Sequence, residues 1–305
     1  MPMLFEPIKP MLLHMNDAAF DDGTWLHELK LDGWRILLHK QGERVEAFSR
    51  RGLRLTQRFP ELREVASAIR WHEAILDCEG VCYRDGKTVF EDFAYRGRLS
   101  QEHKIVHATR TKPASFVVFD VLYDGQDRTR LPLIERKERL SELVQSNSLL
   151  STVAYLDGDN GAALFTWAEQ NGWEGIVSKV KTSRYSIGIR SAEWVKTKVW
   201  RQLDTVVMGY RVKPTFALLV GTYVGDQLKM VATVELGLNA EIKQAVREVS
   251  RSIATTRTDT VQWVEPVICV RIRYREKTER GALRMAVFSQ FLFEWKPEQC
   301  RWGAV

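Results

Sequence analysis

The 305-residue chain has only four cysteines, nine prolines and no long apolar run, and these shortages exclude several classes of protein. Cys78, Cys82, Cys269 and Cys300 form no C-x-x-C pair, so we expect neither a zinc ribbon nor a disulfide framework but reduced, mainly buried thiols. No stretch reaches the roughly 18 consecutive apolar residues that a membrane-spanning helix needs. The first residues also lack the basic and apolar regions of a signal peptide. We therefore expect a cytoplasmic protein that has no membrane partner.

The composition is that of a folded globular chain, with 45% hydrophobic and 28% charged residues. This length allows one large domain or two ordinary ones. The net charge of +6 is unevenly distributed, because residues 201–305 hold 16 basic and 11 acidic residues while the first 200 hold 29 and 28. A basic C-terminal third is typical of a module that meets a polyanion. A solvated basic surface without any partner explains the charge equally well.

Apolar spacing predicts a mixed α+β region over residues 1–200. Short apolar runs bounded by turn residues predict strands, and apolar residues at helical spacing predict helices. The expected strands cover residues 25–29, 36–38, 45–48, 74–83, 115–122, 175–180 and 194–198. The expected helices begin near Pro60, Leu133 and Ala162.

The pattern changes beyond residue 200. Short strands are expected over residues 205–210, 217–224, 228–234 and 267–274, with one helix over 240–252. Several strands with one helix in about 100 residues fit a small barrel such as an oligonucleotide-binding (OB) fold. The sequence therefore predicts two domains, residues 1–200 and 201–305.

Residues 28–35 (ELKLDGWR) hold the most informative lysine of the chain. Lys30 ends an expected strand and precedes the acidic turn Asp32–Gly33, which exposes its amine to a bound electrophile. Lysine is a nucleophile only when neutral, so burial or nearby positive charge, such as a bound divalent cation, must lower its pKa. Taken alone, K-x-D-G is explained more readily by a surface turn with a solvated lysine.

Six ordered segments together resemble the motifs of the covalent nucleotidyltransferases, specifically the ATP-dependent DNA ligases. They are residues 30–35 (KLDGWR), 49–52 (SRRG), 76–80 (LDCEG), 116–123 (FVVFDVLY), 174–179 (EGIVSK) and 194–198 (WVKTK). The resemblance spans residues 10–200 and extends weakly through residues 281–284 and Phe288. Within the family, the chain is similar to the ligase module of bacterial end-joining ligase D. The resemblance implies an α+β nucleotidyltransferase (adenylation) domain followed by a small OB-fold β-barrel domain.

The resemblance also implies roles for individual residues around the nucleotide. Lys30 would attack the α-phosphorus of ATP, release pyrophosphate and form lysyl-AMP. Glu28 lies two residues away on the same strand face, which suits a carboxylate that reads the adenine amino group. Phe119 would stack on adenine, although core packing is the alternative for such a ring. Arg35 and Glu79 would hold the ribose and shape the site.

Further residues are expected to hold phosphates and a metal ion. Arg50 would bind the 5′-phosphate of a nick, because its planar guanidinium binds phosphate oxygens in pairs. Lys196 and Lys198, two positions apart on a strand, can reach one phosphate together. Glu79 and Glu174 are the candidate ligands for Mg²⁺ or Mn²⁺, which takes few direct protein ligands. Lys179 is a weaker candidate beside the phosphates.

The second domain holds alternating arginines. Period-two alternation places Arg271, Arg273 and Arg275 on one face of a strand, where they could follow a DNA backbone. Arg284, in the weakly matching terminal segment, is a further candidate for DNA contact. The alternative is a solvated edge strand that is kept basic against aggregation.

The implied function is that of an ATP-dependent DNA ligase, which seals 5′-phosphate/3′-hydroxyl nicks through lysyl-AMP and an adenylated DNA 5′ end. Its expected cofactors are ATP and Mg²⁺ or Mn²⁺, and its expected partners are nicked double-stranded DNA and DNA-end-binding or repair proteins. We expect a monomer in the bacterial cytosol or associated with the nucleoid.

Three alternatives remain open at this point. An RNA ligase or an mRNA-capping guanylyltransferase of the same superfamily would share the chemistry of Lys30, and an inactive nucleic-acid-binding module would retain only the fold. A preference for GTP would indicate capping, and joining of RNA nicks alone would indicate an RNA ligase. DNA binding without adenylation would indicate the inactive module.

Overall fold

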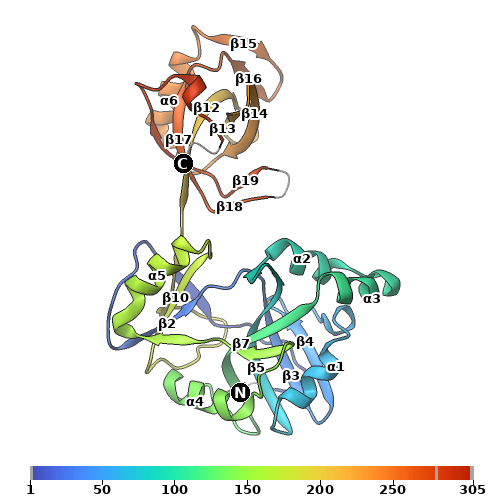
Figure 1. Cartoon of the computed structure of the whole chain (residues 1–305). Coiled ribbons are helices and arrows are strands. Elements are labelled where there is room, and N and C mark those ends of the chain that lie inside the picture. Colours follow the sequence, from blue (N-terminus) through green and yellow to red (C-terminus); the bar gives the residue numbers. More distant parts are fainter. Residues whose placement is uncertain (1–2, 279–280, 303–305) are drawn as a thin grey trace. The chain divides into compact units, whose positions relative to one another are not determined.

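The computed structural model describes residues 3–278 and 281–302, which form two units that divide between Val199 and Trp200 (Figure 1). Each unit has its own sheets and its own buried core. In the described part of the chain, no helix is both long and apolar enough to cross a membrane.

The first unit is built on two sheets. The five-stranded sheet has the order β1 (Leu12–Asn16), β11 (Arg190–Lys198), β10 (Gly175–Val180), β2 (Trp25–Leu29) and β9 (Tyr155–Asp157). The six-stranded sheet has the order β4 (Arg44–Ser49), β3 (Trp34–Gln41), β5 (Glu73–Arg84), β7 (Ala114–Tyr123) and β8 (Leu150–Thr152), with β6 (Lys87–Thr88) paired to β5. Only the pairs β1–β11 and β7–β8 are parallel among these described strands.

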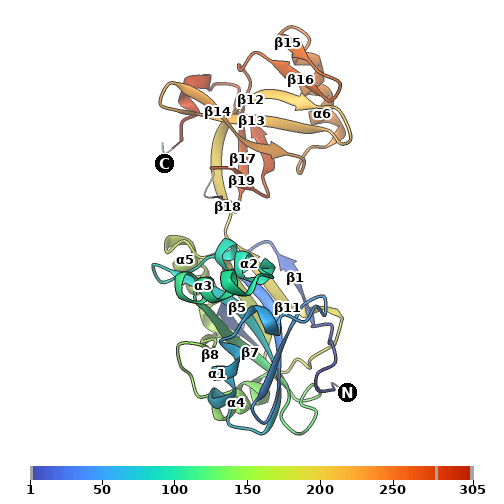
Figure 2. The same cartoon turned by 90° about the vertical axis from the view of Figure 1, so that its right-hand side faces the viewer.

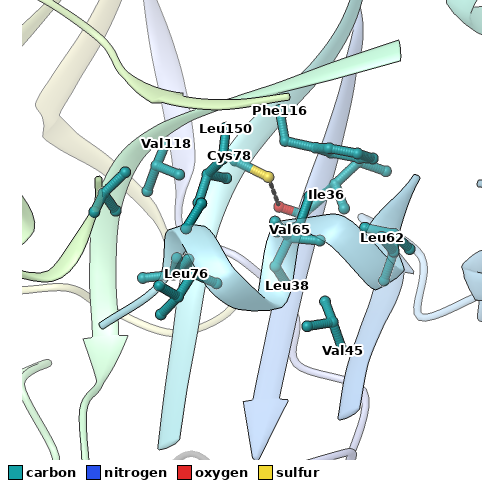
Figure 3. Packing of buried hydrophobic residues seen from close by; sticks show 14 of the residues in the cluster. Ile36, Leu38, Val45, Leu62, Val65, Leu76, Cys78, Phe116, Val118 and Leu150 are labelled. Atoms are coloured by element: carbon teal, nitrogen blue, oxygen red, sulfur yellow. Dashed lines mark hydrogen bonds between the residues drawn. The ribbon is translucent and has the colours of Figure 1, made fainter. Parts of the chain in front are cut away.

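One face of the six-stranded sheet carries the main core of this unit. Successive strand side chains point to opposite faces, and the apolar residues at even positions of β3, β5 and the start of β7 gather on one face. Figure 3 shows them packed against α1, with the Cys78 thiol donating to the Ile36 carbonyl oxygen at 3.2 Å. These buried residues are Ile36, Leu38, Leu76, Cys78, Phe116 and Val118.

The opposite face of this sheet meets the five-stranded sheet. Leu37 of β3, Ile75 of β5 and Leu122 of β7 pack in one buried cluster with Leu26 of β2 and Trp194 of β11. Odd positions of β3 and β5 therefore face the five-stranded sheet. The candidate site residues of these two strands, Arg35 of β3 and Glu79 of β5, also stand at odd positions and therefore lie on this face.

The helices of the first unit differ in part from the sequence prediction. They are α1 (Leu62–Val65), α2 (Phe90–Arg98), α3 (Glu102–Thr111), α4 (Leu133–Leu143) and α5 (Gly161–Gln170). The helix expected after Pro60 is shorter than predicted, because the chain turns into a 3₁₀ segment over Ala66–Ala68. Helices α2 and α3, which lie beside each other in Figures 1 and 2, were not predicted.

The second unit is mainly β-structure with one helix, α6 (Ala240–Val249). Its seven-stranded sheet contains β12 (Arg201–Arg211), β13 (Ala217–Val224), β14 (Gln227–Val234), β15 (Ala254–Arg257), β16 (Val261–Val264), β17 (Cys269–Tyr274) and β20 (Val287–Phe291). The long strand β12 pairs with β13 along one edge, and with β16 and β17 in turn along the other. A two-stranded ribbon is formed by β18 (Glu276–Lys277) and β19 (Leu283–Arg284). All four cysteines of the chain are free and buried, as predicted.

Candidate active site

The loop between β2 and β3 holds Lys30 against the edge of the five-stranded sheet. The Lys30 amide donates to the Gly175 carbonyl at 2.9 Å, and the Asp32 amide donates to Thr88 Oγ1 at 3.0 Å. Gly33 is required for this approach, because a Cβ at this position would come within 2.1 Å of the Gly80 carbonyl oxygen. The loop is therefore fixed at both ends and in the middle by neighbouring strands.

The Lys30 side chain forms an ion pair that the sequence did not predict. Its Nζ lies 2.8 Å from Glu174 Oε2, and Lys198 Nζ binds the other oxygen of the same carboxylate. Burial alone would lower the pKa of Lys30, but the negative charges of Glu174 and Glu79 outweigh burial and raise it. Burial alone would likewise raise the pKa of Glu174, but Lys30 and Lys198 outweigh that effect and lower it. Without a nucleotide, Lys30 is thus a protonated amine.

Glu79 lies beside this group on β5. Burial raises its pKa to about 7, even though the positive charges of Lys30 and Arg35 act in the opposite direction. Arg35 faces Glu79 across the β3–β5 pair. Near neutral pH, Glu79 can therefore hold or release a proton at small cost.

Arg35 is held in place by Asp77, a residue that the sequence analysis did not select. Arg35 Nε and Nη2 donate to the two Asp77 carboxylate oxygens at 2.7 and 2.5 Å, and the Tyr185 hydroxyl donates to Oδ2 at 2.5 Å. The guanidinium carbon lies 4.8 Å from the centroid of the Phe119 ring. A bidentate buried pair fixes the orientation of the guanidinium as well as its position.

A pocket extends from Lys30 between the two sheets, and we call it the base pocket. The residues that line it include Leu13, Glu28, Lys30, Arg35, Glu79, Phe119, Val153, Val177, Lys179 and Trp194. Phe119, which we expected to stack on adenine, does line this pocket. Its ring also contacts two cations, since Lys179 Nζ lies 4.4 Å from its centroid in addition to Arg35.

Glu28 lies in the wall of the base pocket as a buried carboxylate. Lys137 of α4 binds its Oε1, and Lys179 Nζ lies 2.7 Å from its Oε2. Burial, together with the positive charge of Lys137, lowers the pKa of Lys179 to about 8 against the opposing effect of Glu28. Lys137 stands 109 positions from Glu28 in the sequence and lies outside the motifs, so it was not predicted.

A second hollow of about 820 Å³ shares Leu13, Lys30, Arg35 and Glu79 with the base pocket, and we call it the cationic hollow. Among the charged residues of the described chain that line it, Glu79 alone is acidic. The basic ones are Lys30, Arg35, Arg50, Arg51, Arg190, Lys196 and Lys198. The structure thus brings the predicted phosphate-binding residues together and adds Arg51 and Arg190. Arg51 belongs to the same S-R-R-G segment as Arg50, so that segment could have predicted Arg51 as a phosphate-binding residue as well.

The acidic residues near Lys30 suit a metal ion with few protein ligands. Within the described residues, no group of three or more His, Cys, Asp or Glu side chains is arranged to hold a metal. Glu79 and Glu174 both lie close enough to Lys30 to raise its pKa, and each carboxylate offers hard oxygen donors. Such a sparse donor set fits Mg²⁺, which keeps several waters and binds substrate phosphates.

The arginines of the second unit are not equivalent. Side chains of β17 alternate as predicted, with Val270, Ile272 and Tyr274 buried. Arg271, however, donates to Asp204 through Nε at 2.6 Å and Nη2 at 2.9 Å.

The guanidinium carbons of Arg273 and Arg275 lie 5.4 and 5.0 Å from the centroid of the Trp200 ring. Arg284 lies in β19, and its carbonyl accepts the Arg275 amide at 3.2 Å. Of the predicted row of arginines, Arg273 and Arg275 therefore share the Trp200 ring, whereas Arg271 is paired with Asp204.

Comparison with known proteins gives the family of the chain. The sequence pattern described as ATP dependent DNA ligase domain matches residues 2–198, and that of the ATP dependent DNA ligase C terminal region matches residues 212–292. Two solved structures have the same fold over nearly the whole chain. A mycobacterial DNA ligase D complexed with ATP and MES has 27% identity and a TM-score of 0.58, and it covers 98% of this chain and 99% of its own. The ligase domain of LigD from M. tuberculosis has 28% identity and a TM-score of 0.57, with 96% and 97% covered. These likenesses confirm the predicted fold class.

Curated relatives agree with this result. The multifunctional non-homologous end joining protein LigD of Mycobacterium bovis is 29% identical over 97% of this chain, which spans only 40% of that protein's length. The SPbeta prophage-derived DNA ligase-like protein LigB of Bacillus subtilis is 30% identical, with 93% of this chain and 98% of the relative covered. From the match to residues 2–198 and these relatives, the chain belongs to the ATP-dependent DNA ligase family.

Proposed function

We propose that this chain seals nicks in double-stranded DNA with ATP, through an AMP adduct on Lys30. The observation that carries this proposal is the place of Lys30, which lines both the base pocket and the cationic hollow. A nucleotide with its base in the pocket and its phosphates in the hollow would bring its α-phosphate to the boundary between them. Lys30, which lines both, would then meet the α-phosphate there.

The proposed chemistry has three group transfers. The Lys30 amine attacks the α-phosphorus of ATP, so that a P–N bond forms while the P–O bond to pyrophosphate breaks. An oxygen of the DNA 5′-phosphate then attacks the AMP phosphorus and the P–N bond breaks, which returns Lys30 to the amine. Finally the 3′-hydroxyl attacks the 5′-phosphorus, the strand is joined and AMP leaves.

Lys30 must lose a proton before the first transfer, since only the neutral amine attacks. Glu174 and Glu79 hold it protonated in this structure. Mg²⁺ held by these carboxylates would supply positive charge that lowers the pKa of Lys30 and neutralises the phosphates.

The cationic hollow supports the later steps. Lys196 and Lys198 of β11 and Arg50 beyond β4 present positive charge to the phosphates of the nucleotide and of the nick. Phosphoryl transfer depends mainly on such positioning and charge neutralisation. The names of the mycobacterial relatives refer to end joining, which supports broken DNA and its end-binding proteins as the biological partners of this chain.

An adduct assay followed by a sealing assay tests the proposal. The wild-type chain with Mg²⁺ and α-labelled ATP is expected to carry one labelled AMP on Lys30, and a nicked duplex should discharge it as sealed product. Lys30→Ala should form no adduct. No adduct under any Mg²⁺ or Mn²⁺ concentration would overturn the proposal. Labelling by GTP instead, or discharge by RNA nicks alone, would favour the capping or RNA-ligase alternative.

A further inference from the structure

A buried three-residue cluster supports the wall of the base pocket from behind. Glu28, Lys137 and Lys179 are 3%, 6% and 2% exposed. Lys137 binds Glu28 Oε1, and Lys179 Nζ lies 2.7 Å from Oε2. Each oxygen of the Glu28 carboxylate thus has its own cation.

The position of Lys137 is set by its neighbour on α4. Arg136 is fully buried and donates through Nε and Nη2 to the two oxygens of Asp120 on β7, at 2.7 and 2.9 Å. This pair fixes how α4 sits on β7, and the next residue of the helix is thereby held against Glu28. Such an arrangement places a charge with little freedom to move.

Lys137 differs from Lys179 in its relation to the pocket. Glu28 and Lys179 are among the described residues that line the base pocket, whereas Lys137 is not among them. Lys137 therefore acts on a bound nucleotide through its neighbours in the cluster, and Glu28 is the one that it contacts directly. Lys179 is itself held by two aromatic rings, with Nζ 4.4 Å from the Phe119 centroid and 4.3 Å from that of Trp194.

We propose that Lys137 is a positioning residue which holds the Glu28 carboxylate in a fixed orientation, so that the base pocket accepts a 6-amino purine and rejects a 6-oxo purine. An ionised carboxylate only accepts hydrogen bonds. It therefore suits the amino group of adenine and opposes the carbonyl oxygen of a 6-oxo purine. This inference rests on the proposed function, because it assumes that the nucleotide base occupies this pocket.

The effect of removing Lys137 follows from the two contacts of Glu28. Without Lys137, Lys179 at Oε2 would remain as the cation of the cluster that holds the carboxylate, and Oε1 would be released. The carboxylate could then rotate away from the orientation in which it accepts a hydrogen bond from the 6-amino group. Base discrimination should therefore fall while the chemistry at Lys30 is retained.

The test compares ATP with ITP, which replaces the 6-amino group by a 6-oxo group. Single-turnover adduct formation is measured for wild type, Lys137→Met and Lys137→Arg, and Lys181→Met serves as the control. Lys181 forms a surface ion pair with Asp157, outside this cluster. We expect Lys137→Met to lower the ATP/ITP ratio of kcat/KM at least tenfold, mainly through KM. Lys137→Arg and Lys181→Met should stay within threefold of wild type.

Two outcomes would overturn the inference. They are an unchanged ratio in folded Lys137→Met, or a parallel loss for both nucleotides. If Lys137→Met does not fold, Lys137→Gln is measured in the same way. Equilibrium binding of ATP and ITP gives the same ratio without chemistry. A chain that prefers ATP in binding but forms no adduct would therefore contradict the proposed function and leave the role of Lys137 supported.

Discussion

The Lys30 ammonium lies 2.8 Å from Glu174 Oε2, and the second oxygen of that carboxylate binds Lys198. One buried acid thus holds both the candidate nucleophile and a candidate phosphate ligand. The pair stabilises the protonated form of Lys30, which is the form that cannot attack phosphorus. If Lys30 is the nucleophile, as proposed, this pair must break before the amine attacks.

Glu174→Gln is the direct test of that relationship. The change keeps the shape of the side chain but removes the charge that raises the pKa of Lys30. In the absence of nucleotide, we expect an amine-directed reagent to modify Lys30 at a lower pH than in wild type, as measured by peptide mass mapping. Adduct formation from ATP should fall at least 100-fold, because a candidate metal ligand is lost. Glu142→Gln, at an exposed ion pair with Arg139, should change neither measurement.

Glu79 should make stability depend on pH. Burial raises its pKa to about 7 in the folded chain, above its ordinary value of 4.5. The folded state therefore binds a proton that the unfolded state releases between these values, and stability should decrease as the pH rises from 4.5 to 7. Relative to wild type, Glu79→Gln should gain stability over this window, by an amount of the order of 3 kcal/mol. Urea unfolding at a series of pH values measures it, and parallel profiles for the two proteins would contradict it.

Gly33 should tolerate no side chain. A Cβ there would lie 2.1 Å from the Gly80 carbonyl oxygen, so the loop that carries Lys30 must move to admit it. We expect Gly33→Ala to lower the rate of adduct formation at least 100-fold, since small misplacements of a nucleophile are costly. Gly23→Ala is the matched control, because its Cβ would meet only Asp159 Oδ1 at 3.7 Å. Equal rates for the two variants would show that the close approach at Gly33 is unimportant.

Arg271 and Arg273 should act differently on DNA binding. Arg273 is exposed beside Trp200, whereas Arg271 donates through Nε and Nη2 to Asp204. We expect Arg273→Ala to reduce the salt dependence of binding to a nicked duplex by about one unit of slope, as the loss of one phosphate contact does. Arg271→Ala should leave the slope unchanged and lower the stability by up to about 1 kcal/mol. The opposite pattern would mean that Arg271 leaves Asp204 to bind DNA.

The elements that carry the site could be predicted from the sequence because their signals are local. Lys30, Glu79 and Glu174 each stand in or beside an apolar strand segment and shortly before a glycine. The structure places the two glutamates near the Lys30 amine. The two unpredicted helices have a different character. Helices α2 and α3 bury few apolar side chains, Phe93 and Ala94 in α2 and Ile105 and Ala108 in α3, so each offers few apolar residues from which helical spacing can be recognised.

The partners of the site residues could not be predicted from the sequence. Asp77 lies 42 positions from Arg35, and Lys137 lies 109 positions from Glu28. Pairing at such separations is set by how the strands and α4 pack together, which no local spacing encodes. The same holds for Asp204, which binds the first of three arginines that share one strand face.

The burial of every thiol has a practical consequence for following this protein in motion. The four cysteines are at most 3% exposed, and the residues outside the described ranges include no cysteine. A maleimide dye should therefore attach only where a cysteine is introduced, for example at Glu142 in the first unit and at Asp226 in the second, both exposed. Energy transfer between two such dyes would report the separation of the units on single molecules while ATP, AMP or a nicked duplex is added, without removal of any native residue from the core.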